Sequence, residues 1–160
     1  MAARTRLQRI NEQMGRDLRL IYAQRGGFFE DADLDSGRTQ RSGFDNDLLG
    51  TDGLDAITQA VANRLKTRQG ELAPLGHPGY GSRHHELLGE PNVQRTRDLI
   101  KLYVLQALRD EPRIQRVVSV AVSPEHSPPR DTVRIELTVE LIDVPVPLNL
   151  VVPFSLGLSL

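Results

Sequence analysis

The chain of 160 residues contains no cysteine and no tryptophan. The absence of cysteine excludes disulfide bonds, thiol catalysis and zinc held by thiolates. With only three tyrosines and four phenylalanines, the core must be built mainly from Leu, Ile and Val. The sequence also lacks an apolar run of about 18 residues, so we expect no transmembrane helix.

An excess of charge of one sign is lacking as well. The 20 Lys and Arg residues nearly balance the 21 Asp and Glu residues, and the formal net charge is −1. This balance provides no general attraction to nucleic acid or to an anionic membrane. Arg4, Arg6 and Arg9 are not followed by an apolar stretch, so no secretory signal is predicted. We expect a product that is cytoplasmic at synthesis.

The length fits one domain with an additional arm. From Ala2 to Met14, apolar residues recur at helical spacing, and Gly15 follows them. This thin apolar stripe predicts a short amphipathic helix, which needs a docking surface because it is too short to be stable alone. We therefore expect residues 1–14 to form a helical arm and residues 15–160 to form the main domain.

The region before residue 52 gives a weak signal. Residues 17–22 alternate weakly and predict a strand. The stretch from Glu30 to Asp52 is rich in Asp, Gly, Ser and Arg, and it predicts loops with a short strand near Phe28. No internal repeat is visible in the sequence.

Three helices are predicted in the middle of the chain, over residues 52–68, 82–88 and 93–109. Asp52 and Ser82 are suitable N-cap residues for the first two helices. The third helix is the longest, and it stops before Pro112 because the residue preceding a proline disfavours the α conformation. A turn-rich loop over residues 74–81 connects the first helix to the second.

The last third of the chain reads as β-structure. Apolar and polar residues alternate at 118–122 and without error from Thr132 to Leu141, which predicts half-buried antiparallel strands. From Val144 to Leu160 every even-numbered residue is apolar, whereas the prolines occupy odd positions. Since both the side-chain face and the hydrogen-bonding edge alternate with period two, these prolines remove N–H donors from one edge only.

This pattern indicates an edge strand that is paired on one side and partly blocked on the other. An ordinary edge protected against aggregation is one interpretation. The other is a docking edge, where a partner strand pairs near Asn149 and Val151, between the prolines.

Catalytic and metal-binding sites are poorly supported. His77, His84, His85 and Glu86 cluster in sequence, but adjacent histidines on a helix point about 100° apart, so a solvated helix start is the simpler interpretation. Glycoside hydrolysis needs two carboxylates across a sugar cleft, and the candidates by type are Glu71, Glu86, Glu90 and Glu111. We predict no catalytic residue, no metal and no cofactor.

Glu111, Pro112 and Arg113 stand where the long helix gives way to the first C-terminal strand. Proline fixes the direction of the chain there. The Glu and Arg side chains would project away from each other or toward a shared partner. The simpler interpretation is a helix stop with a surface ion pair, which contributes little to stability.

Several of these segments, in this order, resemble one known family. They are Leu65-x-Thr67-x-x-Gly70-Glu71, then Pro78-x-Tyr80-Gly81-Ser82, then Leu87-Leu88, then Glu111-Pro112-Arg113-Ile114 before the Val-rich strands. The sequence resembles the GPW, lysozyme-like baseplate wedge family of contractile phage tails over roughly Gly15 to Phe154. Counterparts are the TssE subunit of type VI secretion and the sheath initiators of extracellular injection systems.

The resemblance implies an α+β fold in which a small antiparallel or mixed sheet packs with two to three helices, like the attachment domain of a sheath subunit. It also implies a structural protein rather than an enzyme, present in several copies in a six-fold particle. The expected partners are other wedge proteins, the sheath protein and inner tube or hub proteins, without nucleic acid or membrane insertion.

The residues expected to contact these partners are Glu111, Pro112, Arg113, Asn149, Val151, Tyr80, Gly81 and Ser82. The alternative function is a peptidoglycan-cleaving hydrolase, as the lysozyme label of the family would suggest. No catalytic pair in this sequence matches such an activity.

Overall fold

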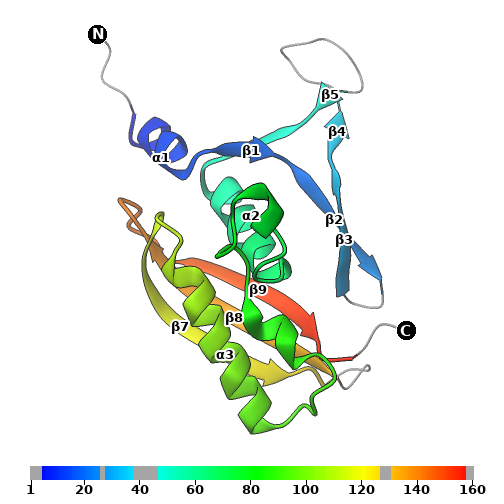
Figure 1. The fold of residues 1–160 in the computed structure, drawn as a ribbon. Helices are drawn as coiled ribbons and strands as arrows, with labels where there is room; N and C mark the ends of the chain where they lie inside the picture. Colours follow the sequence, from blue (N-terminus) through cyan, green and yellow to red (C-terminus); the bar gives the residue numbers. More distant parts are fainter. Residues whose placement is uncertain (1–4, 26–27, 38–46, 127–130, 158–160) are drawn as a thin grey trace. The chain divides into compact units, whose positions relative to one another are not determined.

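The computed structural model describes residues 5–25, 28–37, 47–126 and 131–157. The chain divides into two units, Met1–Ala60 and Val61–Leu160, and helix α2 (Gly53–Lys66) runs across the division. Strands β1 to β6 belong to the first unit and strands β7 to β9 to the second (Figure 1).

Helix α1 (Arg6–Met14) is fixed at both ends by hydrogen bonds. Thr5 and Gln8 cap it reciprocally, because the Thr5 hydroxyl accepts the Gln8 N–H and the Gln8 side chain accepts the Thr5 N–H. At the other end, the Gly15 N–H donates to the carbonyl of Asn11. The predicted helix and its stop at Gly15 are confirmed, and residues 1–4 lie outside the described residues. The division into residues 1–14 and 15–160 stays a prediction.

The strands of the first unit form three two-stranded antiparallel ribbons. The pairs are β1 (Arg16–Leu18) with β6 (Gly50–Asp52), β2 (Leu20–Arg25) with β3 (Phe28–Leu34), and β4 (Ser36–Gly37) with β5 (Asp47–Leu48). The ribbons extend in three directions from a common point (Figure 1). The prediction of loops over 30–52 is therefore wrong for its described part, while residues 38–46 lie outside the described residues.

A ring of three backbone hydrogen bonds joins the ribbons, and we call it the three-way junction. The N–H of Arg19 donates to the carbonyl of Leu49 at 2.8 Å, that of Leu49 to Asp35 at 2.9 Å, and that of Asp35 to Arg19 at 2.8 Å. The residues come from three separate connections between strands. Sequence periodicity carries no signal for such a ring, which explains why the ribbons were not predicted.

Gln59 of helix α2 holds the junction from the side. Its Oε1 accepts the Leu20 N–H at 2.9 Å, and its Nε2 donates to the Leu18 carbonyl at 2.8 Å and to Asp17 Oδ2 at 3.1 Å. The side chain of Gln59 is buried, so these bonds satisfy polar groups on both sides of Arg19.

The second unit is a three-stranded antiparallel sheet of order β7-β8-β9, with helix α3 (Gln94–Arg109) packed on β7 (Figure 1). The strands are β7 (Ile114–Pro124), β8 (Thr132–Leu141) and β9 (Leu148–Ser155). Two short 3-10 helices, η1 (Ala73–Leu75) and η2 (Arg83–Leu87), lie between α2 and α3. The predicted α+β fold with a small sheet is confirmed, and the described sheets are all antiparallel.

One face of this sheet forms the core of the second unit. Its buried side chains alternate along β8 and β9, as predicted: Val133, Ile135, Leu137, Val139, Leu141, Leu150, Val152 and Phe154. Residues Arg134 and Glu136 of the opposite face are exposed. Helix α3 contributes Thr96, Ile100, Val104, Ala107 and Leu108 to the buried part of the unit.

Three details of the strand and helix predictions are corrected. Val118 does not join the buried row, because it is the extra residue of a bulge between Val117 and Ser119 and is 48% exposed. Val144 and Val146 precede β9 rather than belonging to it. Ser82 stands at the N-cap of η2 but makes no side-chain cap bond.

Candidate assembly interface

The segment from Arg68 to Ser82 closes on itself at its two ends. The Ser82 N–H donates to the Thr67 carbonyl at 2.9 Å, and the Gln69 N–H donates to the Ser82 carbonyl at 3.2 Å. The Thr67 hydroxyl donates to the carbonyl of Asn63 one turn back in α2. The loop is therefore tied directly to the end of helix α2 by backbone hydrogen bonds.

Gly81 is required by this close approach of two backbones. It has a φ of +102°, where a side chain is strained. A Cβ atom at this position would lie 2.7 Å from the Thr67 carbonyl oxygen and 2.8 Å from the Arg68 backbone. Gly81 and Ser82 are buried, and in the structure they hold the loop in place.

Tyr80 and the Glu-Pro-Arg motif meet through Arg64 of helix α2. The Arg64 guanidinium lies over the Tyr80 ring, 4.6 Å from its centroid, and its Nη2 lies 3.5 Å from Oε2 of Glu111. The other carboxylate oxygen of Glu111 accepts the Nε–H of Arg113 at 2.6 Å. Two separate sequence motifs thus meet through Arg64 in one chain of contacts.

Glu111 is only 4% exposed, although the sequence interpretation placed its ion pair at the surface. That interpretation is wrong, because the carboxylate turns inward and lies between Arg64 and Arg113. Burial alone would raise the pKa of Glu111, but the hydrogen bond and charge of Arg113, with the charge of Arg64, hold it below the usual value. Glu111 is therefore ionised at neutral pH, and the Arg113 side chain remains 28% exposed.

Sequence reasoning missed Arg64, the residue that connects these motifs. The sequence did contain a signal, because Arg64 shares the apolar face of α2 with Val61 and Leu65 at i+3 and i+4 spacing. A charged residue on such a face is 8% exposed only because it has partners.

The histidines of η2 are another correction. His84 is 1% exposed rather than solvated, and its ring stacks on His85 at 4.3 Å and meets Phe154 of β9 edge-on at 4.4 Å. His84 Nδ1 bonds to the Ser82 hydroxyl at 2.7 Å, and His85 Nε2 donates to the Leu65 carbonyl at 2.9 Å. Burial lowers the pKa of His84 to about 3, with His85 adding to the shift.

Strand β9 is an edge strand, as predicted. In an antiparallel ladder, pairs that exchange backbone hydrogen bonds alternate with pairs that do not. Pro153, which has no N–H, pairs with Arg134 in a position of the second kind. Asn149 and Val151 fall in the same class, and their backbone groups therefore point outward. The N–H of Leu156, an even-numbered residue, instead points inward and donates to the carbonyl of Asp131. We call the outward side of Asn149, Val151 and Pro153 the β9 flank.

Within the part of the chain that the structure describes, no strand pairs with the β9 flank. The side chain of Asn149 is occupied, because its Oδ1 accepts the Thr138 hydroxyl at 2.9 Å on the open face of the sheet. This bond fixes the start of β9 against β8.

Three of the four acidic candidates for hydrolysis are engaged by neighbouring groups. Glu86 is bound by Arg83 through two hydrogen bonds, Glu71 accepts the Arg68 N–H, and Glu111 is enclosed by arginines. A cavity of about 640 Å³ in the first unit is lined by Gln8, Asn11, Glu12, Gly15 and Arg16, with a single carboxylate. Among the described residues, no group of histidines and acids is arranged to hold a metal ion.

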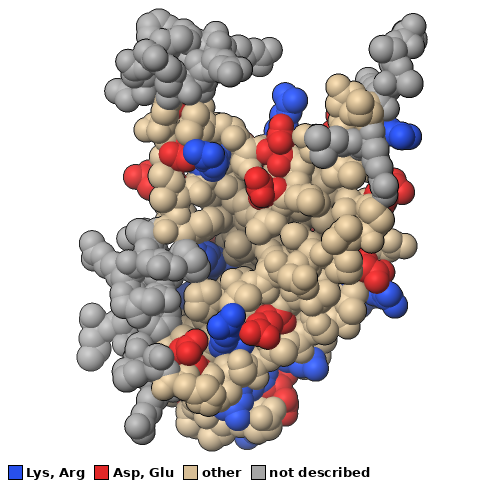
Figure 2. Space-filling view, turned by 180° about the vertical axis from the view of Figure 1, so that it is seen from behind, with Lys and Arg blue, Asp and Glu red and all other residues tan. Residues whose placement is uncertain are grey.

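The surface chemistry agrees with the balanced composition. On the face seen in Figure 2, acidic and basic side chains lie in small mixed groups, and no large field of one sign gathers there. Among the described helices, none is long and apolar enough to span a membrane.

Fold and site together define a small α+β structural module whose distinctive features are a strand edge and a buried Arg–Glu–Arg contact. A family model described as baseplate wedge protein gp25 matches residues 51–146, and the chain belongs to this family. The resemblance seen in the sequence is confirmed, and the chain is a structural baseplate component of a phage-tail type. The matched range ends before β9 begins.

A solved structure supports the same assignment. The chain is 28% identical to a proposed tail lysozyme from Geobacter sulfurreducens whose crystal structure was determined at 1.44 Å, with a TM-score of 0.56. The similarity covers 65% of this chain and 91% of that one. No curated protein matches the chain significantly.

Proposed function

We propose that this chain is the wedge subunit that joins the baseplate wedge to the inner tube region and initiates assembly of the contractile sheath. The β9 flank is the observation that carries the proposal. A strand of the sheath protein adds to it, receiving hydrogen bonds from the N–H groups of Asn149 and Val151. Copies of the chain act together in a six-fold particle.

The ladder geometry favours β9 over β7 as the docking edge. The pairing of β9 with β8 runs without a register shift from Leu148 to Ser155. The β7 edge instead has two irregularities, at 114–116 and 117–119, and bulges of this kind twist an edge away from further pairing. A regular edge also defines the register of the added strand.

The β9 flank limits what can dock. Pro153 offers its carbonyl but no N–H, so the incoming strand needs no acceptor opposite it. On the buried face, the neighbours of the added strand would be Leu150 and Val152, which calls for apolar residues at alternate positions. The docking segment is therefore short and apolar on one face.

We propose that Arg113 makes the second contact, with another wedge protein. Glu111 and Pro112 position it, and Tyr80 supports Arg64 from the loop closed by Gly81 and Ser82. The Arg113 guanidinium is partly exposed, at 28%, and its planar fork suits a carboxylate of the partner.

We also propose that the chain has no catalytic role. The alternative, a peptidoglycan hydrolase, requires one protonated and one ionised carboxyl group facing the same bond. The partners of Glu111 keep it ionised and enclosed. A digestion assay of purified peptidoglycan separates the two functions, since release of muropeptides would support the hydrolase.

The strand-pairing proposal is tested by removing a single outward N–H. Val151→Pro deletes the donor while the inward bonds to β8 remain, and Val151→Ala removes the same exposed side chain but keeps the donor. Co-expressed with the cognate sheath and tube proteins, the alanine variant should nucleate sheaths and the proline variant should not. Normal sheaths with a folded proline variant would contradict strand pairing at β9.

A further inference from the structure

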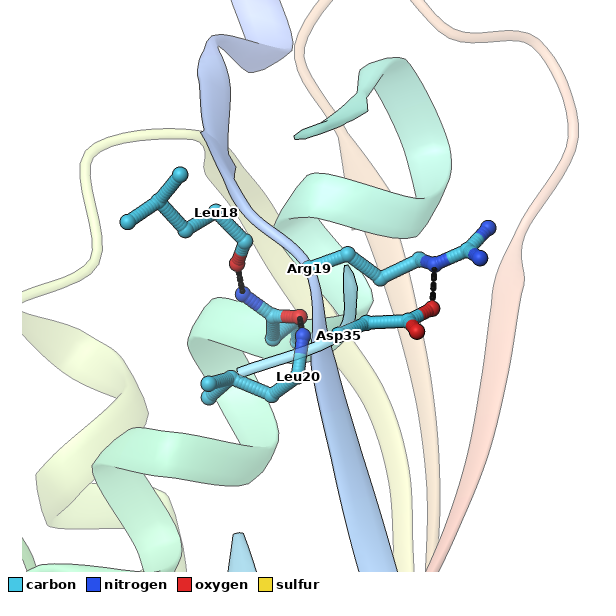
Figure 3. Close-up of polar contacts among 5 residues, drawn as sticks. Leu18, Arg19, Leu20 and Asp35 are labelled. Carbon is cyan, nitrogen blue, oxygen red and sulfur yellow. Dashed lines mark hydrogen bonds and ion pairs between the residues drawn. The ribbon is translucent and has the colours of Figure 1, made fainter. Parts of the chain in front are cut away.

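Four leucines share one face of the three-way junction, and we call this the leucine face. Leu20 pairs directly with Leu34, Leu18 is two residues before Leu20, and Leu48 pairs with Ser36, which is two residues after Leu34. Directly paired residues and residues two apart project to the same side. Figure 3 shows Leu18 and Leu20 on one side of the strand, and Arg19 and Asp35 forming an ion pair on the other.

Three of these leucines occupy equivalent positions around the junction. Each follows an aspartate whose Oδ1 accepts the N–H of the leucine, in Asp17-Leu18, Asp33-Leu34 and Asp47-Leu48, at 2.8, 2.8 and 2.9 Å. Their exposed fractions are nearly equal, at 43%, 43% and 45%. The sequence therefore does contain a short repeat, which was not recognised because its copies are separated by strands and loops.

Such exposure indicates an interaction surface. Two-stranded ribbons are marginally stable in water, and contiguous exposed apolar side chains mark sites that a partner covers. Among the described residues, each ribbon pairs only within itself and meets the others at the junction. The junction nevertheless has a rigid base, because its backbone ring and Gln59 hold the leucines in place.

The backbone around the leucines is already hydrogen-bonded, which argues against recognition by an added strand. The N–H groups of Leu18, Leu34 and Leu48 bond to aspartates, and that of Leu20 bonds to Gln59. A partner therefore has to recognise side chains. An α-helix presents side chains and satisfies its own backbone, so it suits this surface better than a strand.

Charge determines the chemistry of that helix. Each of the three equivalent leucines has a carboxylate beside its backbone, because Asp17, Asp33 and Asp47 accept the leucine N–H groups, whereas Asp35 is paired with Arg19 on the opposite side. The surroundings of the leucine face are thus acidic, and a second copy of this chain would bring like charges together. A partner with Lys or Arg beside its apolar stripe would instead be attracted.

We propose that the leucine face is a second docking surface, on a different unit from the β9 flank, and that it binds the apolar stripe of a basic amphipathic helix from another protein chain. The surface lies outside the range matched by the family model, apart from residues 51 and 52 at its edge. Its binding does not depend on sheath initiation or on the β9 flank.

The test measures the binding of a synthetic helical peptide of about 18 residues, or five turns. The peptide has leucines at i, i+3, i+4 and i+7 and lysines beside them, and a matched peptide has glutamates in place of the lysines. The variant Leu18→Ser/Leu34→Ser/Leu48→Ser should weaken binding of the lysine peptide about tenfold or more. The control Leu75→Ser/Leu102→Ser/Leu105→Ser changes exposed leucines of the second unit and should bind like wild type.

A second variant tests the charge separately. Asp33→Asn/Asp47→Asn keeps oxygen acceptors for the N–H groups of Leu34 and Leu48 but removes two negative charges. The dependence of peptide affinity on salt should become shallower than in wild type. An unchanged salt dependence would contradict the charge argument.

Circular dichroism and amide exchange at Arg19 and Leu49 verify that the variants keep the junction. The proposal is overturned if wild type fails to bind the lysine peptide at about 100 μM, or if the glutamate peptide binds equally well. It is also overturned if the Leu75, Leu102 and Leu105 control variant loses affinity for the lysine peptide as much as the Leu18, Leu34 and Leu48 variant does. Self-association of wild type that disappears in the junction variant would assign the leucine face to a second copy instead.

Discussion

Arg113 donates its Nε–H to Oε1 of Glu111 at 2.6 Å, across a single proline. The backbone N–H of Arg113 points to the same oxygen at 3.4 Å. Because Pro112 fixes φ between them, the two side chains form a preformed unit with the glutamate buried and the arginine partly exposed. The motif therefore presents one oriented arginine to a partner rather than two independent charges.

Replacement of Arg113 should separate assembly from folding. Arg113→Ala should lower the free energy of unfolding by only about 1 kcal/mol, because the side chain is partly exposed, but it should abolish assembly into baseplate particles. Arg113→Lys should assemble weakly, since lysine lacks the planar fork. Urea denaturation and sedimentation of particles measure the two effects. Arg109→Ala, an exposed arginine of α3, is the control, and normal particles with Arg113→Ala would show the assigned role to be wrong.

Replacement of Glu111 should instead affect folding directly. Glu111→Gln leaves Arg64 buried with an uncompensated charge, which should lower the free energy of unfolding by about 3 kcal/mol. Glu86→Gln is the matched control, because the Glu86–Arg83 pair is exposed and its loss should leave the urea midpoint nearly unchanged. Equal stability of the two variants would mean that Glu111 is not held in a buried pair.

Two glycines of the loop closed by Thr67 and Ser82 should respond differently to substitution by alanine. Gly81→Ala places a Cβ atom against the backbone of Thr67 and Arg68 at a strained φ, and should lower the free energy of unfolding by about 3 kcal/mol. Gly79→Ala is the control, because no atom lies within 4 Å of the added Cβ. Thermal unfolding compares them, and a stable Gly81→Ala protein would exclude the close approach.

The C-terminal sheet was predictable because one buried face imposes a period of two on the sequence. From Val133 to Leu141 every apolar residue is buried, and the polar residues between them are exposed or half-buried. The edge position of β9 followed from the parity of its prolines, and Pro153 does stand at a pair where no donor is needed. The sequence pattern was sufficient to predict these strands because β8 and β9 both alternate between buried apolar residues and more exposed ones.

The three-way junction was not predictable in the same way. Its strands are as short as two residues, and its hydrogen bonds join segments that are distant in sequence. The bulge at Val118 and the burial of His84 also depend on the tertiary structure. Neither feature changes the local pattern of apolar and polar residues in the sequence. Arg64 is different, because its position on the apolar face of helix α2 could have been recognised in the sequence.

Acid should destabilise the second unit in a defined pH range. Burial lowers the pKa of His84 to about 3 and also lowers that of His85, which lies near Arg68 and Glu71. Below the unfolded value of about 6.5, the unfolded chain binds protons that the folded chain excludes. The histidine contribution to the free energy of unfolding is therefore fully present above pH 6.5 and should fall as the pH decreases, by up to about 1.4 kcal/mol per pH unit for each histidine that stays unprotonated in the folded chain; for His84 the fall continues toward pH 3.

The depressed pKa of Glu111 adds a further loss of stability as the pH falls below about 4.5. Urea denaturation from pH 7.5 to 4.5 measures the slope due to the histidines. His84→Gln should flatten it, whereas His77→Gln, at an exposed position, should not. A slope near zero in wild type would contradict the burial of His84.

Gln59 offers the most specific test of the three-way junction. Gln59→Ala leaves the Leu20 N–H and the Leu18 carbonyl without their side-chain partner and should cost about 2 kcal/mol, with faster amide exchange at Leu20. Gln59→Glu has nearly the same shape but directs a carboxylate oxygen at Asp17 Oδ2 and the Leu18 carbonyl, so it should not restore protection. Thr58→Ala, on the exposed side of α2, is the control for the helix itself. Full protection of Leu20 in the glutamate variant would mean that Gln59 does not donate to the junction, and the ring of Arg19, Asp35 and Leu49 would then have to be stable without it.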